Sequence, residues 1–483
     1  MVIDALKYQI LQQFGFVPTE EQGQALDAFA RFLTDRAPHA VMILRGSAGT
    51  GKTSLSGAIV RTLKAIRQKV MLLAPTGRAA KVFSLNSGYP AYTIHRRIYR
   101  EKSFAGVDGQ FNLNDNLFTD TLFMVDEASM ISNLGLGGGN FGSGCLLDDL
   151  VRFVYQGHND RLMLIGDKAQ LPPVGEEESP ALNRMMLEGY GLKVYECDLN
   201  EVLRQSQESG ILYNATVIRQ MITHDDITQL PLIRFKGFAD IVMMPGNELV
   251  VSLANSYYRV GWDETMVITR SNKRANIYNN GIRNMVLDRE EELSCGDMLM
   301  IVKNNYFWTE KERNEAKEAL NAIPPFLANG DRAKVLRVSR HMELYGFRFA
   351  TLLLQFPDYD NYEMSVTALL DTLQSEAPAL THEQQEQLFH GVEEDYQDVP
   401  LKADRMKAIR GDQYFNALQV KYAYAITCHK AQGGQWEHVY VDQGYMTDDM
   451  LTPDYIHWLY TAFTRAKGKL FLVNWPKTQT EQA

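Results

Sequence analysis

The segment Gly46–Thr53 limits what this chain can fold into more than any other, because it reads GSAGTGKT and fits the pattern GxxxxGK[ST]. A short apolar run, Val41–Gly46, precedes it, and a helical pattern follows from Thr53 to about Lys69. A second apolar run, Val70–Pro75, completes a strand–helix–strand unit. Nearly continuous apolar runs of this kind are typical of strands buried on both faces of a parallel sheet, so we predict an α/β fold.

The GSAGTGKT loop has the groups that a bound nucleoside triphosphate requires. Its glycines allow backbone N–H groups to wrap the phosphates, and the following helix N-terminus favours negative charge. Lys52 reaches the β- and γ-phosphates, and the Thr53 hydroxyl binds Mg²⁺. The alternative, a chance glycine-rich turn, is disfavoured by the position between strand and helix. We expect ATP and Mg²⁺ as cofactors, bound by the loop residues Gly46, Ala48, Gly49, Thr50, Gly51, Lys52, Thr53 and Ser54.

Two adjacent carboxylates, Asp126 and Glu127, follow another apolar run in the segment TLFMVDEASM. We expect Asp126 to bind the magnesium ion and Glu127 to polarise an attacking water. Solvation of a strand end is the alternative explanation, and the phosphate-binding loop upstream shifts the weight toward catalysis. Because an adjacent glutamate suits water activation, hydrolysis of ATP is favoured over phosphoryl transfer to another substrate.

The chain has 483 residues, which is too long for one ordinary domain. Later apolar runs at Thr265–Asn272 and Gln419–Gly433, and the run KLFLVNW near the end, predict a second sheet of the same kind. The fold class predicted is therefore α/β with two P-loop-type lobes, each built on a parallel sheet, plus two smaller β-rich inserts.

Eight further segments form an ordered series with the loop, and the series is far more specific than any member. It runs GSAGTGKT, LLAPTGRAAKVF, AYTIHR, FMVDEAS, LIGDKAQLPPVG, LNEVLRQ, ITRSNKRAN, YAITCHKAQGGQW and WLYTAFTRAK. This order resembles the motif series of superfamily 1B helicases, the RecD-like and Dda-like group, from about Thr19 to Lys467. The resemblance implies two RecA-like lobes and a DNA helicase that hydrolyses ATP and moves 5′→3′ on single-stranded DNA.

The resemblance also implies a division of the chain into four parts. The first lobe (1A) comprises residues 1–95 and 121–205, with a hairpin insert (1B) at 96–120 that acts as a pin to split the duplex. The second lobe (2A) comprises residues 206–335 and 418–483, with an SH3-like insert (2B) at 336–417.

Four more residues join the nucleotide site through the resemblance. Gln22 would contact the adenine edge, and Gln170 would sense the γ-phosphate. Arg204 and Arg465 match the arginine fingers of the family, which stabilise charge on the transferred phosphate. Because Arg465 belongs to the second lobe, hydrolysis would require the lobes to close. The alternative for each arginine is an ordinary ion pair.

A second set of residues matches family positions that line the single-strand path. Hydroxyl, imidazole and cationic groups at strand ends suit phosphate and sugar contacts, which carry no sequence information. The chain as a whole has a net charge of −10, but residues 61–102 hold ten Lys or Arg and one Glu. Interior histidines are the alternative for His95 and His429. The predicted contacts are Thr76, Arg78, Thr93, His95, Thr427, His429 and Lys430.

Each insert allows more than one interpretation. The Asp108-Gly109 dipeptide predicts a hairpin turn, and Phe104 or Phe111 could stack on a base, although aromatic residues in hairpins usually pack across strands. Residues 358–400 hold eleven acidic residues and no Lys or Arg. This acidic segment would face solvent, bind a partner protein or repel the displaced strand.

Other features exclude several classes of protein. The four cysteines are far apart in the sequence and form no CxxC pair, which argues against a zinc or disulfide framework and favours the cytoplasm. No stretch approaches the length of apolar sequence that spans a membrane. We expect a monomer-capable protein that binds single-stranded DNA and single-strand/duplex junctions. Open alternatives are a translocase that does not unwind, an ATPase subunit of a repair complex and a P-loop switch unrelated to nucleic acid.

Overall fold

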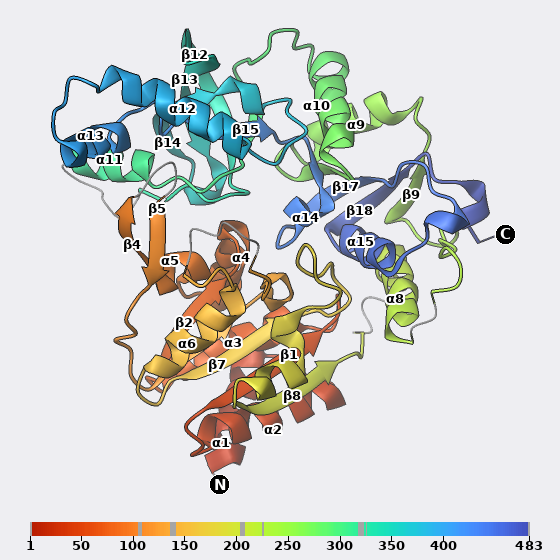
Figure 1. The fold of residues 1–483 in the computed structure, drawn as a ribbon. Helices are drawn as coiled ribbons and strands as arrows, with labels where there is room; N and C mark the ends of the chain where they lie inside the picture. The colour runs from red at the N-terminus through yellow and green to blue at the C-terminus, as the bar shows by residue number, and fades with distance from the viewer. Residues whose placement is uncertain are drawn as a thin grey trace.

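The described residues form two parallel sheets, a closed β-barrel and a β-hairpin (Figure 1). The structure is a computed structural model that describes residues 2–104, 109–135, 142–202, 208–224, 227–316, 323–324 and 326–481. The predicted fold class, two parallel α/β lobes with smaller β inserts, is confirmed.

The first lobe is a six-stranded parallel sheet with the order β3-β2-β6-β7-β1-β8. Strands β1, β6 and β7 are buried along their whole length, as expected for the centre of such a sheet. The strands are β1 Ala40–Gly46, β2 Lys69–Ala74, β3 Ala91–Thr93, β6 Thr121–Val125, β7 Arg161–Gly166 and β8 Lys193–Leu199.

Helices cover both faces of this first sheet. One apolar cluster joins α1, α2 and α3 to one face, and a second cluster joins α5 and α6 to the other. The helices of the lobe are α1 Val2–Phe14, α2 Glu20–Thr34, α3 Lys52–Ala65, α4 Gly77–Ser87, α5 Ile94–Ile98, α6 Leu146–Gln156 and α7 Arg184–Gly189.

The second lobe is a five-stranded parallel sheet with the order β16-β10-β17-β18-β9. Its strands are β9 Ile241–Met244, β10 Thr265–Thr269, β16 Ala425–Thr427, β17 Trp436–Asp442 and β18 Ala466–Val473. Its helices are α8 Gly210–Thr223, α9 Leu249–Arg259, α10 Asn272–Gly281, α14 Cys428–Ala431 and α15 Pro453–Phe463. Within the described ranges, no helix combines the length and apolar character that crossing a bilayer requires.

The barrel closes through five strands drawn from distant parts of the chain. They are β11 Met298–Ile301, β12 Arg332–Leu344, β13 Phe347–Phe356, β14 Tyr362–Leu369 and β15 Leu418–Tyr422. Strands β11 and β15 lie outside the predicted insert at 336–417, whose boundaries remain a prediction. Helix α11 Phe307–Glu315 precedes β12, and α12 His382–Asp395 and α13 Lys402–Arg410 lie between β14 and β15.

The prediction that Gln419–Gly433 belongs to the second parallel sheet is partly wrong. Residues up to Tyr422 form β15 of the barrel, and only β16 pairs with the parallel sheet. Ala423 and Tyr424, between the two strands, are 4% and 2% exposed. Because the chain stays buried while it passes from barrel to sheet, the apolar run shows no break at the boundary.

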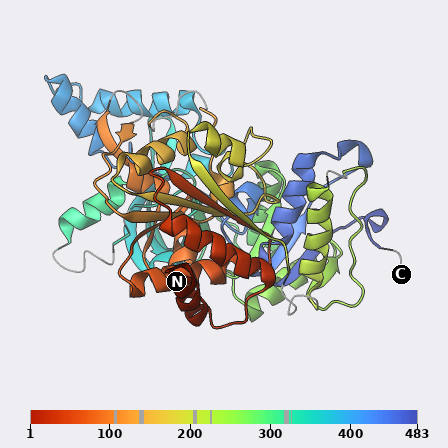
Figure 2. The same cartoon turned by 90° about the horizontal axis from the view of Figure 1, so that it is seen from below.

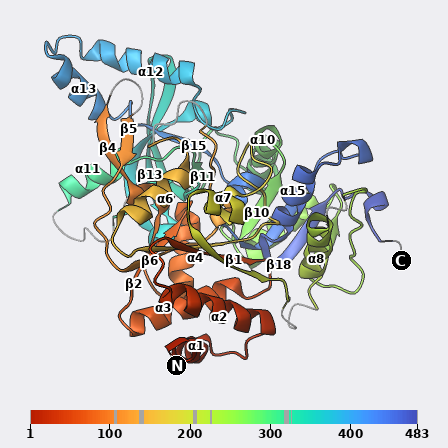
Figure 3. The same ribbon diagram turned by 60° about the horizontal axis from the view of Figure 1, so that its bottom comes forward.

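The hairpin consists of β4 Tyr99–Phe104 and β5 Gly109–Leu113, which pair antiparallel. The predicted turn residue Asp108 lies outside the described residues. The two strands extend from the first lobe toward the barrel insert (Figures 1 and 3). The view from below in Figure 2 places the C-terminus beyond the second lobe, on the side away from α12 and α13.

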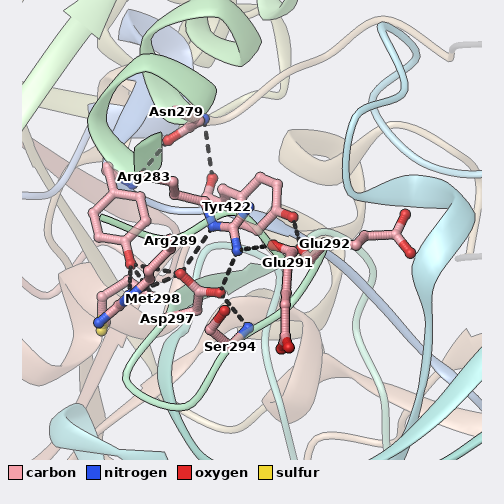
Figure 4. Close-up of polar contacts among 10 residues, drawn as sticks. Asn279, Arg283, Arg289, Glu291, Glu292, Ser294, Asp297, Met298 and Tyr422 are labelled. Atoms are coloured by element: carbon pink, nitrogen blue, oxygen red, sulfur yellow. Dashed lines mark hydrogen bonds and ion pairs between the residues drawn. The ribbon is translucent and has the colours of Figure 1, made fainter. Parts of the chain in front are cut away.

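A buried ion network joins the second lobe to the barrel (Figure 4). Asp297 is fully buried and accepts hydrogen bonds from Arg283 at 3.0 Å and Arg289 at 2.8 Å. Arg283, which follows α10, also lies over the ring of Tyr422 in β15, 4.6 Å from its centroid. Asn279 in α10 donates to the Ala425 carbonyl at 3.0 Å. These contacts fix the barrel at the point where its last strand leads into the parallel sheet.

Candidate nucleotide site and single-strand path

The predicted phosphate-binding loop connects β1 to α3. Gly49 and Gly51 have φ values of +78° and +76°, which L-residues with a side chain rarely adopt. Gly51 immediately precedes the first residue of α3, Lys52, so the loop amides and the helix N-terminus lie together. The Lys52 ammonium donates to the Gly46 carbonyl at 2.9 Å. Thr53 and Ser54 lie in the first turn of α3, where a hydroxyl can approach a metal bound to the phosphates.

Asp126 and Glu127 lie at the carboxyl end of β6, two strands from β1 in the sheet. Asp126 accepts from the Glu127 amide at 2.9 Å. Burial and the neighbouring Glu127 charge raise the pKa of Asp126 to about 6, while the charge of Lys52 opposes the rise. Glu127 has a left-handed backbone with φ of +52°, which is uncommon for a residue with a long side chain.

Two buried oxygen atoms in this region have no hydrogen-bond partner among the described residues. They are Oε2 of Glu127 and Oε1 of Gln170. Leaving such atoms without a partner costs free energy, and unsatisfied polar atoms of this kind are concentrated at functional sites. Together with Lys52 and Asp126, they fit a bound triphosphate, its metal ion and an attacking water.

Both polar atoms of the Gln22 side chain form hydrogen bonds with the protein backbone. It is 1% exposed, its amide nitrogen donates to the Thr50 carbonyl at 2.9 Å, and its oxygen accepts from the Thr19 amide at 3.0 Å. Gln22 therefore supports the phosphate-binding loop from α2. A contact with adenine would require at least one of these hydrogen bonds to be exchanged.

The second lobe contacts the phosphate-binding loop at two points. The Tyr460 hydroxyl in α15 donates to Asp167 at 2.7 Å and accepts from the Ala48 amide at 3.0 Å. Arg219 in α8 donates to the Ser47 hydroxyl. Burial and the Asp167 charge raise the pKa of Tyr460 well above its ordinary value, so this hydroxyl keeps its proton.

Helix α15 also binds the loop that carries Gln170. Thr461 accepts from the Leu171 amide at 2.8 Å, and the His457 ring contacts the Ala169 carbonyl at 2.9 Å. The segment that follows β7 in the first lobe is thus held by a helix of the second lobe, next to the Tyr460 contact.

The two predicted arginine fingers have different positions. Arg204 lies outside the described residues. Arg465 is 3% exposed and donates to the Thr461 carbonyl at 3.0 Å and to the Gly434 carbonyl at 3.2 Å, both in the second lobe. A role for Arg465 at the γ-phosphate remains a prediction that would require its guanidinium to exchange these partners.

The predicted strand contacts of the first lobe lie around α4 and α5. Thr76 caps α4 by accepting from the Ala79 amide at 3.2 Å. The Arg78 guanidinium stacks on Trp436 of the second lobe, 4.3 Å from the ring centroid. Thr93 Oγ1 is buried and has no hydrogen-bond partner among the described residues. Burial lowers the pKa of His95 to about 4, so this ring is neutral at pH 7.

The predicted strand contacts of the second lobe lie at α14. Thr427 precedes the helix, and His429 and Lys430 lie within it. Burial and the neighbouring Lys421 charge lower the pKa of Lys430 to about 8, and within the described part of the chain its ammonium has no hydrogen-bond partner. Phe104, the predicted stacking residue, belongs to β4, but its side chain lies outside the described atoms.

Three residues of the site were not predicted from the sequence: Asp167, Tyr460 and Arg219. Asp167 and Tyr460 belong to the segments LIGDKAQLPPVG and WLYTAFTRAK, where the residue types suit interior packing as well. Arg219 lies in a helix with no motif, and its role depends on the position of α8 over the loop.

Comparison with known families is consistent with this arrangement. A family model described as an AAA domain matches residues 19–225, and a model described as a UvrD-like helicase C-terminal domain matches residues 422–473. Against the ATP-dependent RecD2 DNA helicase of Deinococcus radiodurans, the chain is 31% identical over 157 residues, 32% of this chain and 18% of that protein. The chain therefore spans under a fifth of that relative.

Two other similarities extend over most of the chain. An uncharacterized protein of Acanthamoeba polyphaga mimivirus is 21% identical over 497 residues, 89% of this chain and 95% of that protein. The crystal structure of Pif1 helicase from Bacteroides in complex with ADP-AlF3 and ssDNA is 13% identical, with a TM-score of 0.47, over 97% of this chain and 95% of that chain. An AAA-domain model over the first lobe, a UvrD-like helicase model over the end of the second and the RecD2 match thus support the resemblance of the motif series to superfamily 1B helicases.

Proposed function

We propose that this protein is an ATP- and Mg²⁺-dependent DNA helicase that moves 5′→3′ along single-stranded DNA and unwinds duplex. The observation that carries the proposal is the distribution of buried polar atoms without hydrogen-bond partners in the described residues. Glu127 and Gln170 supply them beside the phosphate-binding loop, and Thr93 and Lys430 supply them on the predicted strand path. Two polar ligands, a nucleotide and a strand, would satisfy the two groups.

In the nucleotide site, Lys52 and the loop amides would hold the phosphates, while Thr53 and Asp126 would hold Mg²⁺. The metal ion, when bound, neutralises charge on the phosphate oxygens. Glu127 would orient the attacking water and accept its proton at Oε2, the atom that has no partner in the described structure. Arg204 and Arg465 are proposed to stabilise charge on the γ-phosphate once the lobes close.

Coupling between the sites would pass through α15. The Tyr460 hydroxyl occupies the Ala48 amide, one of the loop N–H groups suited to a phosphate oxygen. Nucleotide binding would therefore exchange this contact between the lobes and change how α15 lies on the first lobe. Alternating grip on the strand by Thr76 and His95 in one lobe and His429 in the other would convert that change into movement.

The proposal also assigns roles to the hairpin and to the acidic segment, and it includes the oligomeric state and the location of the protein. The hairpin β4–β5 would separate the strands at a junction, and the acidic segment 358–400 would be the surface for any protein partner. We propose that the protein acts as a monomer in the cytoplasm.

A single set of assays tests this function. We expect ATPase activity to be stimulated by single-stranded DNA, and forks with a 5′ tail to be unwound in preference to forks with a 3′ tail. Glu127→Gln should bind ATP and DNA while turnover falls by about 10²- to 10⁴-fold, the usual contribution of a general base. If the ATPase rate does not change with DNA, both the helicase and the translocase functions are refuted. If single-stranded DNA stimulates the ATPase but forks are not unwound, the protein is a translocase that does not unwind.

A further inference from the structure

Arg332, the first residue of β12, is a buried cation with an incomplete set of partners. It is 6% exposed, and its Nη2 atom donates to the Asp263 carbonyl at 3.0 Å. Its Nε atom is buried and has no hydrogen-bond partner in the described structure. No carboxylate of the described residues forms a salt bridge with this guanidinium, so its positive charge is not neutralised by direct contact.

A second guanidinium lies on the same aromatic ring. Arg78 of α4 is 4.3 Å from the centroid of Trp436, and Arg332 is 5.8 Å from the centroid of a ring of the same residue. Trp436 is 1% exposed, and its indole N–H also has no partner among the described residues. The first lobe, the barrel and the second lobe each contribute one of these three side chains.

The nearby carboxylates Asp358 and Glu264 each pair with a lysine, although Asp358 Oδ2 is buried and has no hydrogen-bond partner among the described residues. Asp358 lies 3.7 Å from the Lys81 ammonium, and Glu264 lies 3.2 Å from the Lys467 ammonium. Burial, followed by the charge of Arg332, lowers the pKa of Arg78 to about 10. Two guanidinium charges on one ring, neither in direct contact with a carboxylate, repel each other, and an anion between them would relieve both the repulsion and the unsatisfied N–H group of Arg332.

The surroundings indicate which anion this is. Arg78 lies in the first turn of α4, two residues after Thr76, at the predicted strand path. Gly434, which follows the Thr427–Lys430 segment, packs so closely that a Cβ there would lie 2.9 Å from Arg78 Nε. The phosphate-binding loop belongs instead to β1, three strands away from β2 in the sheet. A guanidinium presents a planar fork that matches phosphate oxygens.

We propose that Arg332 of the barrel, together with Arg78 across Trp436, binds one phosphate of the single-stranded DNA where the two lobes and the barrel meet. The inference rests on the proposed function and adds to it a contact from the barrel. It also places the strand next to Arg465, which donates to the Gly434 carbonyl at 3.2 Å. Arg78 and Arg332 together form a phosphate clamp.

The test compares Arg332→Gln with Arg337→Gln, which removes the same charge from an exposed position on the same strand. The dissociation constant for a fluorescein-labelled oligothymidylate is measured by anisotropy over a range of NaCl concentrations, with folding checked by circular dichroism. For R332Q we expect about tenfold weaker binding at low salt. The slope of log K against log[NaCl] should shrink by about 0.7, the value for one phosphate contact on a single strand. R337Q should match the wild type.

The outcomes separate the clamp from the proposed function. Wild-type protein that does not bind the oligonucleotide would overturn both. If the wild type binds the oligonucleotide but R332Q and R337Q have the same dissociation constant and salt slope, the clamp alone is overturned. The clamp is also overturned if R332Q binds a non-hydrolysable ATP analogue more weakly while its affinity for the oligonucleotide is unchanged. If R332Q does not fold, Arg332→Lys replaces it: the clamp predicts a kept slope with weaker binding, and wild-type affinity would contradict it.

Discussion

Asp331 is a buried carboxyl whose protonation should affect stability. It is 1% exposed and accepts from the Ala328 amide at 2.7 Å and from the Tyr359 hydroxyl at 2.8 Å. Burial raises its pKa from 3.8 to about 7. The folded state therefore binds more protons than the unfolded state between these two values, and the free energy of unfolding must fall as pH rises through this window.

We expect Asp331→Asn to remove this part of the pH dependence. The stability of the wild type relative to D331N should decrease between about pH 5 and pH 7, by at most about 1.4 kcal/mol per pH unit. Urea unfolding at several pH values measures the difference, with the exposed Asp360→Asn as a control for removal of a carboxylate. Parallel stability curves for wild type and D331N would show that Asp331 is ionised in the folded protein throughout.

Tyr460 connects the lobes through a single hydroxyl, and its removal should alter nucleotide affinity. In Tyr460→Phe the Ala48 amide no longer has to release a hydrogen bond before it binds a phosphate. One net hydrogen bond corresponds to roughly 3- to 10-fold in affinity, so Y460F should bind a non-hydrolysable ATP analogue that much more tightly. The matched control is Tyr455→Phe in the same helix, whose hydroxyl bonds to Gln443 within the second lobe. If Y460F binds the analogue with wild-type affinity, the Tyr460 hydroxyl does not compete with the phosphate for the Ala48 amide.

At the level of elements, the sequence predicts those whose pattern is local. The P-loop unit, the strand before Asp126 and the hairpin follow from apolar runs, glycines and turn residues, and the structure contains all three. The division of Gln419–Gly433 between barrel and sheet could not be predicted, because buried barrel strands and buried parallel strands have the same apolar composition.

The site shows the same limit. Lys52, Asp126 and Glu127 are predictable because their chemistry depends on neighbours in sequence. Arg332 and Arg219 are not, because each acquires its role from a side chain more than a hundred residues away, Trp436 and Ser47 respectively. No local pattern distinguishes such arginines from surface residues.

The hairpin β4–β5 is the element that should distinguish unwinding from movement. We expect that replacing residues 103–110 with a two-residue Asn-Gly turn leaves ssDNA-stimulated ATPase intact, because the phosphate-binding loop and the residues of α4 and α14 are unchanged. Unwinding of a forked duplex should be lost. The ATPase of the same variant serves as its control for folding. Unwinding at the wild-type rate would show that β4–β5 is an ordinary surface hairpin.

At the scale of the whole molecule, the ion network around Asp297 joins the second lobe to the barrel. Asp297→Ala would leave the Arg283 guanidinium, only 3% exposed, without its carboxylate. Loss of one partner of a buried ion pair typically costs about 3–5 kcal/mol, so D297A should unfold at a markedly lower urea concentration. Glu292→Ala is the control, because its ion pair with Arg348 is solvent-exposed and should contribute under about 1 kcal/mol. If D297A and E292A lower the free energy of unfolding by the same amount, the buried network contributes no more to stability than an exposed ion pair.

The acidic helix α12 lies at one edge of the molecule, beside α13 and away from the first sheet (Figure 1). Its exposed residues Glu383, Glu386 and Glu394 carry negative charge, whereas residues 61–102 of the first lobe carry a strong positive excess. The positive excess is local to this segment, because residues 121–205 of the same lobe hold thirteen Asp or Glu against six Lys or Arg. A polyanion would thus be attracted to residues 61–102 and repelled by α12, so encounters near α4 and α5 would be favoured over encounters near α12.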